Sequence, residues 1–422
     1  MKVDRDRLRE DIQRNGSFGS IESESGTGRT VLTGSEADRR VREFFVDQLA
    51  ALGLDVRIDP VGNIAGRWEP TGCDPNAKPV ASGSHLDSVP RGGIFDGPLG
   101  VYAAVEAVRT LQQADVTLER PVEIVAFTEE EGQRFNQGLL GSSVAAGERS
   151  VSKALGLEDA SGTTLREYLQ RIDFHGDQSI DPGKWNSWLE LHIEQATKLE
   201  TAGISAGVVT SITGIANCVV EISGESNHAG STRMYDRVDS LVAASEFIQD
   251  VDRISREIVA TESDFAVATV GEITVEPNAR NVVPGNVTLS IDIRDVDLDI
   301  IDEITTLAKR SLARIEEKWG VDASFDRYRT VDPVPMSDRC RKALIMASER
   351  NDIETIDLAS GGGHDTMKFA PLTDVGMLFA PSENGISHSP EEWTDWEDCA
   401  RATQILTEAL AQLAGVDLPK SE

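Results

Sequence analysis

The segment KPVASGSHLDSV (residues 78–89) has the composition of a short apolar strand that breaks into a polar loop. After it, GVYAAVEAVRTLQQ (100–113) has the apolar spacing of a helix, and RPVEIVAFTEEEG (120–132) is a second apolar strand that ends in acids. This alternation of strand, helix and strand predicts an α/β fold with a mostly parallel sheet. The polar clusters follow strands, and open α/β sheets bind ligands at the carboxyl ends of their strands.

The pattern changes near residue 212. From ITGIANCVVEISGES (212–226) onward the spacing predicts a β-α-β-β-α unit of about 120 residues, which is large enough for a core of its own. After residue 331 the chain returns to helix, strand and glycine-rich loop. We therefore expect a larger α/β domain formed by residues 1–211 and 332–422, with a smaller α+β domain, 212–331, inserted into it.

The composition excludes several classes of protein. The formal net charge of −31 disfavours nucleic acid as a partner, because phosphates are bound by basic surfaces. No apolar stretch is long enough for a membrane helix and the charged N-terminus does not resemble a signal peptide, so we expect a cytoplasmic protein with no membrane partner. Because the acidic charge is dispersed, we hypothesise a high-salt cytoplasm, in which self-repulsion is screened.

Most of the histidines share one kind of surroundings. Five of the six lie in polar segments beside Gly, Asp, Glu or Ser. They are His85, His192, His228, His364 and His388. A single histidine is more often structural than a ligand, but that interpretation weakens when almost the whole set behaves alike. The sixth, His175, lacks such neighbours, and we expect it to be structural.

His85 and Asp87 form an H-L-D motif at the end of the first strand. Residues i and i+2 of an extended segment point the same way, so the Asp87 carboxylate can hold an imidazole that binds a metal. The alternative is that Asp87 only caps the following turn. Asp96 has two interpretations as well: it binds a cation, or it caps the helix that begins after it.

Three acids, Glu129, Glu130 and Glu131, follow the second strand, and such a run is often only a solvated loop. Its place at the end of a buried strand favours a site, although the residues alone do not choose among the three. Imidazoles and carboxylates without thiolates suit Zn²⁺, Mn²⁺, Co²⁺ or Ni²⁺. Two such ions that share a carboxylate can activate water for hydrolysis, with a nearby Glu as the base.

Seven segments, in order along the chain, resemble the signatures of one family. They are GSHLDSVPRGGIFDGPLGV (83–101), AFTEEEGQRF (126–135), LHIEQ (191–195), NHAGSTRM (227–234), PNARNVVPG (277–285), GGGHD (361–365) and GISHSPEE (385–392). The family is that of the dinuclear-metal amidohydrolases of the M20 peptidase clan. Within it, the chain most resembles the group of N-carbamoyl-L-amino acid hydrolase, β-ureidopropionase and allantoate amidohydrolase.

The resemblance implies a zinc-peptidase-like catalytic domain with an inserted lid and dimerisation domain, and two divalent ions per subunit, with Zn²⁺ the first choice. One ion is held by His85, Asp96 and His192. Glu131 and His388 hold the other, and Asp96 bridges the two.

The resemblance also implies roles around these ions. Glu130 matches the general base, and Asp87 orients His85. Glu129 matches no functional position, and we expect it to face solvent.

The substrate contacts follow from the same resemblance. Arg294 and Asn281 match the residues that bind the substrate carboxylate, although without the resemblance Arg294 is better explained as a surface charge on an edge strand. Gln195 and His364 match contacts to the amide end. His228 matches the histidine that stabilises the oxyanion from the other subunit of a homodimer.

The activity that we expect is hydrolysis of the ureido C–N bond of N-carbamoyl-L-amino acids to the amino acid, carbon dioxide and ammonia. Allantoate or a ureidoglycolate-type compound is an alternative substrate, because both share the ureido and carboxylate groups. An aminopeptidase or dipeptidase is a second alternative within the clan. A non-catalytic protein that binds metal or amino acids is a third, which the intact Glu130 and ligand positions disfavour.

Overall fold

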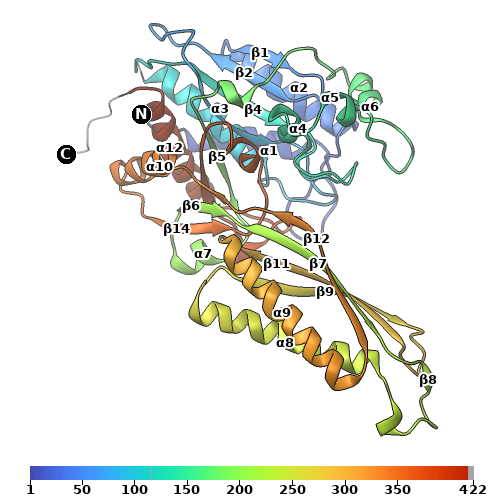
Figure 1. The fold of residues 1–422 in the computed structure, drawn as a ribbon. Coiled ribbons are helices and arrows are strands. Elements are labelled where there is room, and N and C mark those ends of the chain that lie inside the picture. The colour runs from blue at the N-terminus through green and yellow to red at the C-terminus, as the bar shows by residue number, and fades with distance from the viewer. Residues whose placement is uncertain (115, 417–422) are drawn as a thin grey trace. The chain divides into compact units, whose positions relative to one another are not determined.

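The computed structural model describes residues 1–114 and 116–416. The chain divides into two compact units (Figure 1). Unit 1 is Met1–Thr210 together with the chain from Met336 onward, and unit 2 is Ser211–Pro335. The roles of lid and dimerisation domain that the sequence assigns to residues 212–331 stay predictions.

The large sheet is parallel at its centre, where β4, β3, β5 and β15 lie side by side. The full order is β1-β2-β4-β3-β5-β15-β6-β13, with antiparallel pairs toward both edges and β14 paired with β6. The predicted α/β fold with a mostly parallel central sheet is therefore confirmed. The strands are β1 (Asp55–Ile58), β2 (Ile64–Trp68), β3 (Val80–His85), β4 (Val122–Phe127), β5 (Ser187–Glu194), β6 (Ala206–Ile212), β13 (Val334–Pro335), β14 (Thr355–Ser360) and β15 (Asp374–Pro381).

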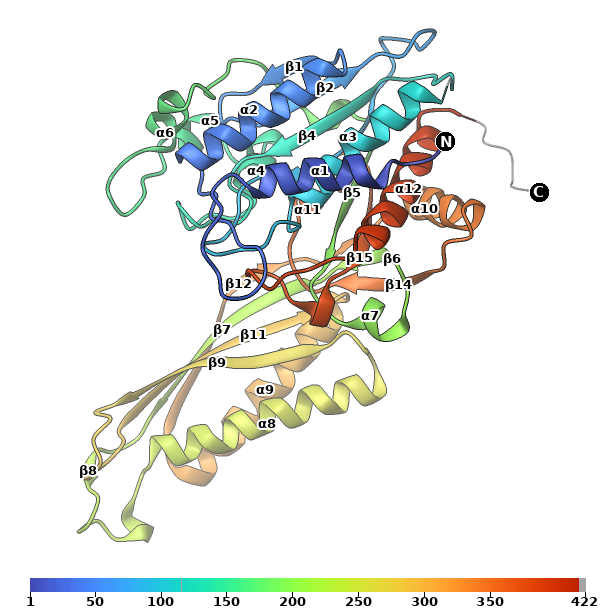
Figure 2. The same ribbon diagram turned by 180° about the vertical axis from the view of Figure 1, so that it is seen from behind.

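Helices surround this sheet in unit 1 (Figures 1 and 2). Several begin at a side chain that accepts a backbone N–H of the first turn, as Asp4, Ser35 and Asp395 do. The helices are α1 (Arg5–Gly16), α2 (Glu36–Ala51), α3 (Pro98–Gln113), α4 (Leu140–Ala145), α5 (Val151–Leu155), α6 (Leu165–Arg171), α7 (Lys198–Ala202), α10 (Asp338–Arg350), α11 (Thr366–Phe369) and α12 (Trp396–Leu413), with short 3₁₀ turns at Pro182–Lys184 and Glu383–Gly385.

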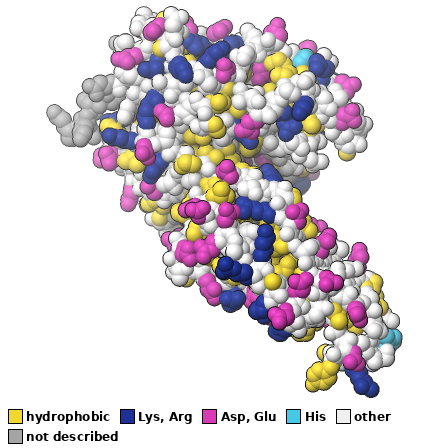
Figure 3. All heavy atoms as spheres, in the orientation of Figure 1, with side chains coloured by type: hydrophobic (Ala, Val, Ile, Leu, Met, Phe, Trp, Pro, Cys, Tyr) yellow, Lys and Arg dark blue, Asp and Glu magenta, His cyan; other side chains and the backbone are white. Residues whose placement is uncertain are grey.

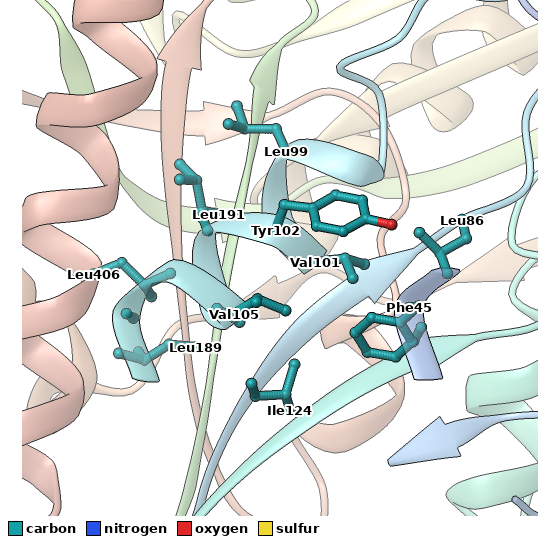
Figure 4. Close-up of a cluster of buried hydrophobic side chains, with 14 of the residues drawn as sticks. Phe45, Leu86, Leu99, Val101, Tyr102, Val105, Ile124, Leu189, Leu191 and Leu406 are labelled. Carbon is teal, nitrogen blue, oxygen red and sulfur yellow. The ribbon is translucent and has the colours of Figure 1, made fainter. Parts of the chain in front are cut away.

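Both faces of the central strands are covered, and every residue of β3, β4 and β5 is buried. On one face, Leu189 and Leu191 of β5 pack in the core with α3 and with Leu406 of α12 (Figure 4). On the other face, the centroid of the Trp188 ring lies 5.1 Å from that of Phe369 in α11. Successive side chains of a strand point to opposite faces, and polar groups also meet within the sheet, where Ser84 of β3 donates its hydroxyl to Oε1 of Glu190 in β5 (2.8 Å).

Helix α3 packs against the sheet, and its residues from Pro98 to Leu111 are all buried. Gly100 is the reason. A Cβ at this position would lie 2.3 Å from the carbonyl oxygen of Leu191 and 2.9 Å from the Cβ of Ser84. The missing side chain lets the helix begin directly above the ends of β3 and β5.

Unit 2 is an antiparallel sheet in the order β12-β7-β11-β9, and helices α8 and α9 pack together against one face of it. Along β7 the buried residues alternate, as the period of a half-covered strand requires. The elements are β7 (Gly214–Ser223), β8 (Asn227–His228), a 3₁₀ turn (Met234–Asp236), α8 (Ser240–Thr261), β9 (Val267–Glu276), β10 (Val282–Val283), β11 (Asn286–Asp295), α9 (Leu298–Trp319) and β12 (Asp322–Val331). The sequence pattern missed β12, whose side chains are mostly exposed.

Acidic side chains are scattered over both units on the face shown in Figure 3. Among the residues that the structure describes, no helix combines the length and the apolar character needed to cross a membrane. The cytoplasmic location and the high-salt setting stay predictions from the sequence.

Replacing Gly100 with Ala should destabilise unit 1 by about 1–3 kcal/mol, because α3 has to move away from the sheet. Alanine is the better helix former by only about 1 kcal/mol, so the clash with Leu191 outweighs that gain. Urea unfolding followed by circular dichroism measures the change. The control is Gly361→Ala, where a Cβ meets no atom within 4 Å. Equal unfolding midpoints for the two variants would contradict this packing argument.

Candidate metal centre

The candidate ligands come from four neighbouring strands of unit 1. His85 is the last residue of β3, and His192 lies near the end of β5. Glu130 and Glu131 follow β4, and His388 follows β15. Because β4, β3, β5 and β15 are parallel neighbours, their carboxyl ends lie along one edge of the sheet, and these side chains converge there.

The first group of side chains is His85, Asp96 and His192, all buried. The Oδ1 atom of Asp96 lies 3.4 Å from Nε2 of His85 and 3.2 Å from Nε2 of His192. The Nδ1 atoms point the other way, to the carbonyl oxygens of Asp87 (3.3 Å) and Ile193 (3.1 Å). A proton on Nδ1 that is donated to a carbonyl leaves the Nε2 lone pair for a metal, and we assign the tautomers on that basis.

The second group is Asp96, Glu131 and His388. The Nε2 atom of His388 lies 3.3 Å from Oε2 of Glu131 and 3.6 Å from Oδ2 of Asp96. Asp96 therefore turns one carboxylate oxygen toward each group. His388 is the outlying member: half of its side chain is exposed, and its backbone has a φ of 56°.

The two groups fit divalent cations by distance and by charge. Ligand atoms bound tetrahedrally at about 2.0–2.2 Å from one ion are about 3.4 Å apart, close to the separations found in both groups. Burial, and then the charge of Asp96, raises the pKa of Glu131 to about 8. Burial opposes ionisation of Asp96 too, but the charge and hydrogen bonds of His192 and His85 in their protonated forms hold its pKa well below the usual value. A bound cation would take the place of these Nε2 protons. Cations between these side chains would offset the crowded negative charge.

Glu130 lies beside the first group and belongs to neither. Its Oε2 atom is 3.7 Å from Nε2 of His85. Burial raises the pKa of Glu130 well above its ordinary value, against the opposing charge of His85. A carboxylate at this place is able to accept a proton from a water molecule held between the two groups.

Asp87 has a different main contact from the one expected. Its carboxylate lies 3.7 Å from Nδ1 of His85, farther than the main-chain oxygen of the same residue. Instead, its two oxygens accept the backbone N–H groups of Glu130 (3.2 Å) and Glu131 (3.1 Å). Asp87 therefore touches His85 through its backbone and fixes the turn of the two glutamates through its side chain.

The expectation that Glu129 faces solvent is wrong. Its side chain is buried, and Oε1 accepts the backbone N–H groups of Arg134 (2.7 Å) and Phe135 (3.0 Å). Its φ is 55°, and burial, followed by the charge of Asp87, raises its pKa to about 7. The chain folds back after β4, and the carboxylate holds this turn, which a sequence pattern does not reveal.

Two of the proposed substrate contacts also lie beside the centre. Gln195 donates from Nε2 to Oδ2 of Asp96 (2.9 Å), where Ser387 also hydrogen-bonds through Oγ (2.5 Å). The His364 ring is buried, with its centroid 4.6 Å from that of His192. Burial, and then the proximity of His192, lowers the pKa of His364, which keeps this ring neutral.

The other three proposed contacts belong to unit 2. Nδ1 of His228 accepts the backbone N–H groups of Gly230 (3.0 Å) and Ser231 (3.1 Å), so the proton of the neutral ring is on Nε2. The carbonyl of Asn281 accepts the N–H of Ala229, which places Asn281 beside this loop. Arg294 lies on β11, where Oδ1 of Asp292 accepts its Nε–H at 2.7 Å.

Asp87→Asn should weaken cation binding by the group that contains Glu131 about 10- to 100-fold. The asparagine has one acceptor oxygen, so one of the two glutamate N–H groups faces an amide NH₂ instead. Zinc titration of chelator-treated protein measures the affinity. Asp357→Asn, an exposed aspartate paired with Arg341, is the control. Unchanged affinity in the Asp87 variant would show that its carboxylate does not hold the turn.

Comparison with known proteins places these motifs in context. The signature of peptidase family M20/M25/M40 matches residues 81–412. The chain is 36% identical over 406 residues to the N-carbamoyl-L-amino acid amidohydrolase of Geobacillus stearothermophilus, covering 95% of this chain and 97% of that protein. It is 35% identical to the allantoate amidohydrolase of Bacillus subtilis, covering 87% of this chain and 88% of that one.

Other relatives and structures agree. A ureidoglycolate hydrolase of Arabidopsis thaliana is 34% identical, covering 98% of this chain and 87% of its own. The crystal structure of a hydantoinase/carbamoylase family amidase from Burkholderia ambifaria aligns with a TM-score of 0.92 and 31% identity, covering 99% of both chains. Relatives this similar carry three different substrate names, so similarity alone does not choose the substrate.

Proposed function

The chain belongs to peptidase family M20/M25/M40, and from that membership we propose that it hydrolyses the ureido C–N bond of N-carbamoyl-L-amino acids. The family is metal-dependent, and the amidohydrolase relatives mark the chain as a hydrolase of amide C–N bonds. The observation that carries the proposal is the placement of Asp96, with one oxygen toward each ligand group, and of Glu130 beside them. The products are the free amino acid, carbon dioxide and ammonia.

Two divalent cations complete the proposed site. His85, Asp96 and His192 would hold one. Glu131 and His388 would hold the other, and Asp96 would contribute to both. The nitrogen and oxygen donors suit Zn²⁺ best, and Mn²⁺, Co²⁺ or Ni²⁺ are accepted by the same set. When bound, such a pair lowers the pKa of water toward neutrality and offsets the negative charge that develops during hydrolysis.

Glu130 is the proposed base. Its carboxylate takes a proton from the attacking water as the new C–O bond forms at the ureido carbon. It returns that proton to the departing nitrogen as one C–N bond of the ureido carbon breaks, which leaves a carbamate. The carbamate then loses carbon dioxide and releases the second nitrogen, so one water is consumed and the products are the amino acid, carbon dioxide and ammonia. The burial that raises its pKa makes it a stronger base than an exposed glutamate.

Residues of unit 2 are proposed to hold the substrate. The guanidinium of Arg294, oriented by Asp292, binds the substrate carboxylate together with Asn281. His228 donates from Nε2–H to the ureido oxygen, which fits the tautomer that its loop enforces. Gln195 and His364 contact the amide end. In this proposal unit 2 acts as a lid that closes over the substrate.

We also propose a homodimer formed through unit 2. Strand β9 is an edge of the four-stranded sheet, and its Val267 and Ile273 are exposed apolar side chains. An uncovered edge of this kind can pair with a second copy of the chain. In the dimer, His228 of one subunit donates to the ureido oxygen of a substrate bound at the cation site of the other subunit.

Allantoate and ureidoglycolate-type compounds are the second candidates. Each presents the same ureido and carboxylate groups, and relatives of similar identity carry those substrate names. In this proposal, the choice among these substrates is made by the part of the pocket that contacts the substrate beyond its ureido and carboxylate groups.

An assay of ammonia release tests the substrate and the base together. Metal-loaded protein is incubated in high salt with a panel of N-carbamoyl-L-amino acids, their D-enantiomers and allantoate. We expect turnover of the L-compounds, and a loss of about 10²- to 10⁴-fold in Glu130→Gln with the cations still bound. Near-normal turnover by Glu130→Gln would show that Glu130 is not the base. Turnover of allantoate alone would show that allantoate, and not an N-carbamoyl-L-amino acid, is the substrate.

Co-expression of two inactive variants tests the shared site. We expect Glu130→Gln and His228→Ala to be inactive separately. If His228 acts across the dimer, a heterodimer of the two variants has one site in which both groups are intact and one site in which both are lost. Random pairing makes half of the dimers heterodimers, so about a quarter of the parent activity is restored. No recovery in heterodimers purified with two different tags would place His228 in the site of its own subunit.

A further inference from the structure

We propose that Glu392 is a positioning residue that braces the second cation site, which consists of Asp96, Glu131 and His388. The inference rests on the proposed function, because it concerns how that site is assembled. Glu392 lies four residues after His388 in the chain, yet its carboxylate holds the backbone of the distant Asp96 loop. Its carboxylate contacts backbone N–H groups and the hydroxyl of Ser387, so we assign it the role of placing other residues.

The contacts of Glu392 are with the main chain at Asp96. The side chain is 1% exposed. Its Oε1 atom accepts the backbone N–H of Phe95 at 2.8 Å and that of Asp96 at 3.1 Å. Two N–H groups converging on one buried oxygen fix the peptide plane before Asp96, and with it the direction in which the Asp96 carboxylate leaves the backbone.

Ser387 extends this link to the His388 loop. Its Oγ lies 2.5 Å from Oδ2 of Asp96 and 3.2 Å from Oε2 of Glu392. The Oδ2 atom is the oxygen that Asp96 turns toward His388. The hydroxyl has one proton, which it donates to one of these carboxylates at a time, and it lies within hydrogen-bonding distance of both the bridging aspartate and the residue that holds it.

The second site needs such a brace more than the first. His85 and His192 are buried and lie on central strands of the sheet. His388 is half-exposed and sits in a loop with left-handed backbone. A ligand on an irregular loop is positioned only by what its neighbours contact, and loss of such contacts costs metal affinity.

The loop that contains Asp96 approaches Glu392 closely at Gly93. A Cβ at Gly93 would lie 2.1 Å from its Oε1, so the loop approaches as closely as a glycine permits. The buried side chain of Arg29 donates to two carbonyl oxygens of the same loop, those of Gly93 (3.1 Å) and Asp87 (3.2 Å). Arg29 thus holds carbonyl groups of this loop, and Glu392 holds two of its N–H groups.

Cation binding measured without substrate tests the brace. Chelator-treated parent, Glu392→Ala, Glu392→Gln and Ser387→Ala are titrated with Co²⁺, whose visible absorption reports each bound equivalent. The parent should bind two equivalents. Glu392→Ala should bind one equivalent of Co²⁺ about 10- to 100-fold more weakly than the parent does. Its affinity for the other equivalent should stay within about threefold of the parent value. Glu392→Gln keeps an acceptor for the two N–H groups and should bind like the parent.

The matched control is Glu391→Ala, which removes the neighbouring exposed carboxylate, hydrogen-bonded to Ser25. It should bind both equivalents normally. If Glu392→Ala does not fold, Ser387→Ala takes its place in the test. Ser387→Ala should lower the affinity for the same equivalent of Co²⁺. Parent-like binding by Glu392→Ala, or by Ser387→Ala where only that variant folds, overturns the brace alone. Equal weakening in Glu392→Gln and Glu392→Ala also overturns it, since charge rather than position would then matter. A parent that binds no second equivalent overturns the proposed two-cation function as well.

Discussion

The structure depends on bringing many carboxylates close together at one edge of a parallel sheet. Asp96 is at the centre of this arrangement, with one oxygen facing two imidazoles and the other facing Glu131 and His388. Burying like charges at this density is unfavourable unless they are protonated or paired with cations. The parallel strands end at one edge of the sheet and so bring the loops and side chains that carry these groups together there.

A second set of carboxylates holds the first in place without joining it. Asp87, Glu129 and Glu392 each accept two backbone N–H groups, in the turns that carry Glu130, Glu131 and Asp96. Charge-assisted hydrogen bonds to backbone are stronger than neutral ones, so a few buried acids can fix irregular loops that helices and strands do not support. Some acids of this region therefore hold the backbone of the loops, while others are the proposed cation ligands and base.

The sequence predicted the α/β fold with its parallel strands, because that depends on local periodicity and residue type. It also predicted a change of pattern near residue 212, and the second compact unit begins at Ser211. The residues alone left the cation ligands open, and the set around Asp96 followed only from the resemblance to a known family. The sequence failed where a role depends on contacts between distant segments. Glu129 looked like a solvated member of an acidic run, and nothing in the run tells that Phe135 folds back onto it. Glu392 stood in a recognised motif, but its partner N–H groups lie nearly three hundred residues earlier in the chain. Strand β12 was missed because few of its side chains are buried.

The most direct test of the account is a crystal structure of the zinc-loaded protein with anomalous diffraction recorded at the zinc edge. The account predicts two anomalous peaks about 3.5–4 Å apart, with one oxygen of Asp96 on each. The peak beside His85 and His192 and the peak beside Glu131 and His388 should both be present in every subunit. A single peak, or ions bound by other side chains with Asp96 unligated, would contradict the central claim.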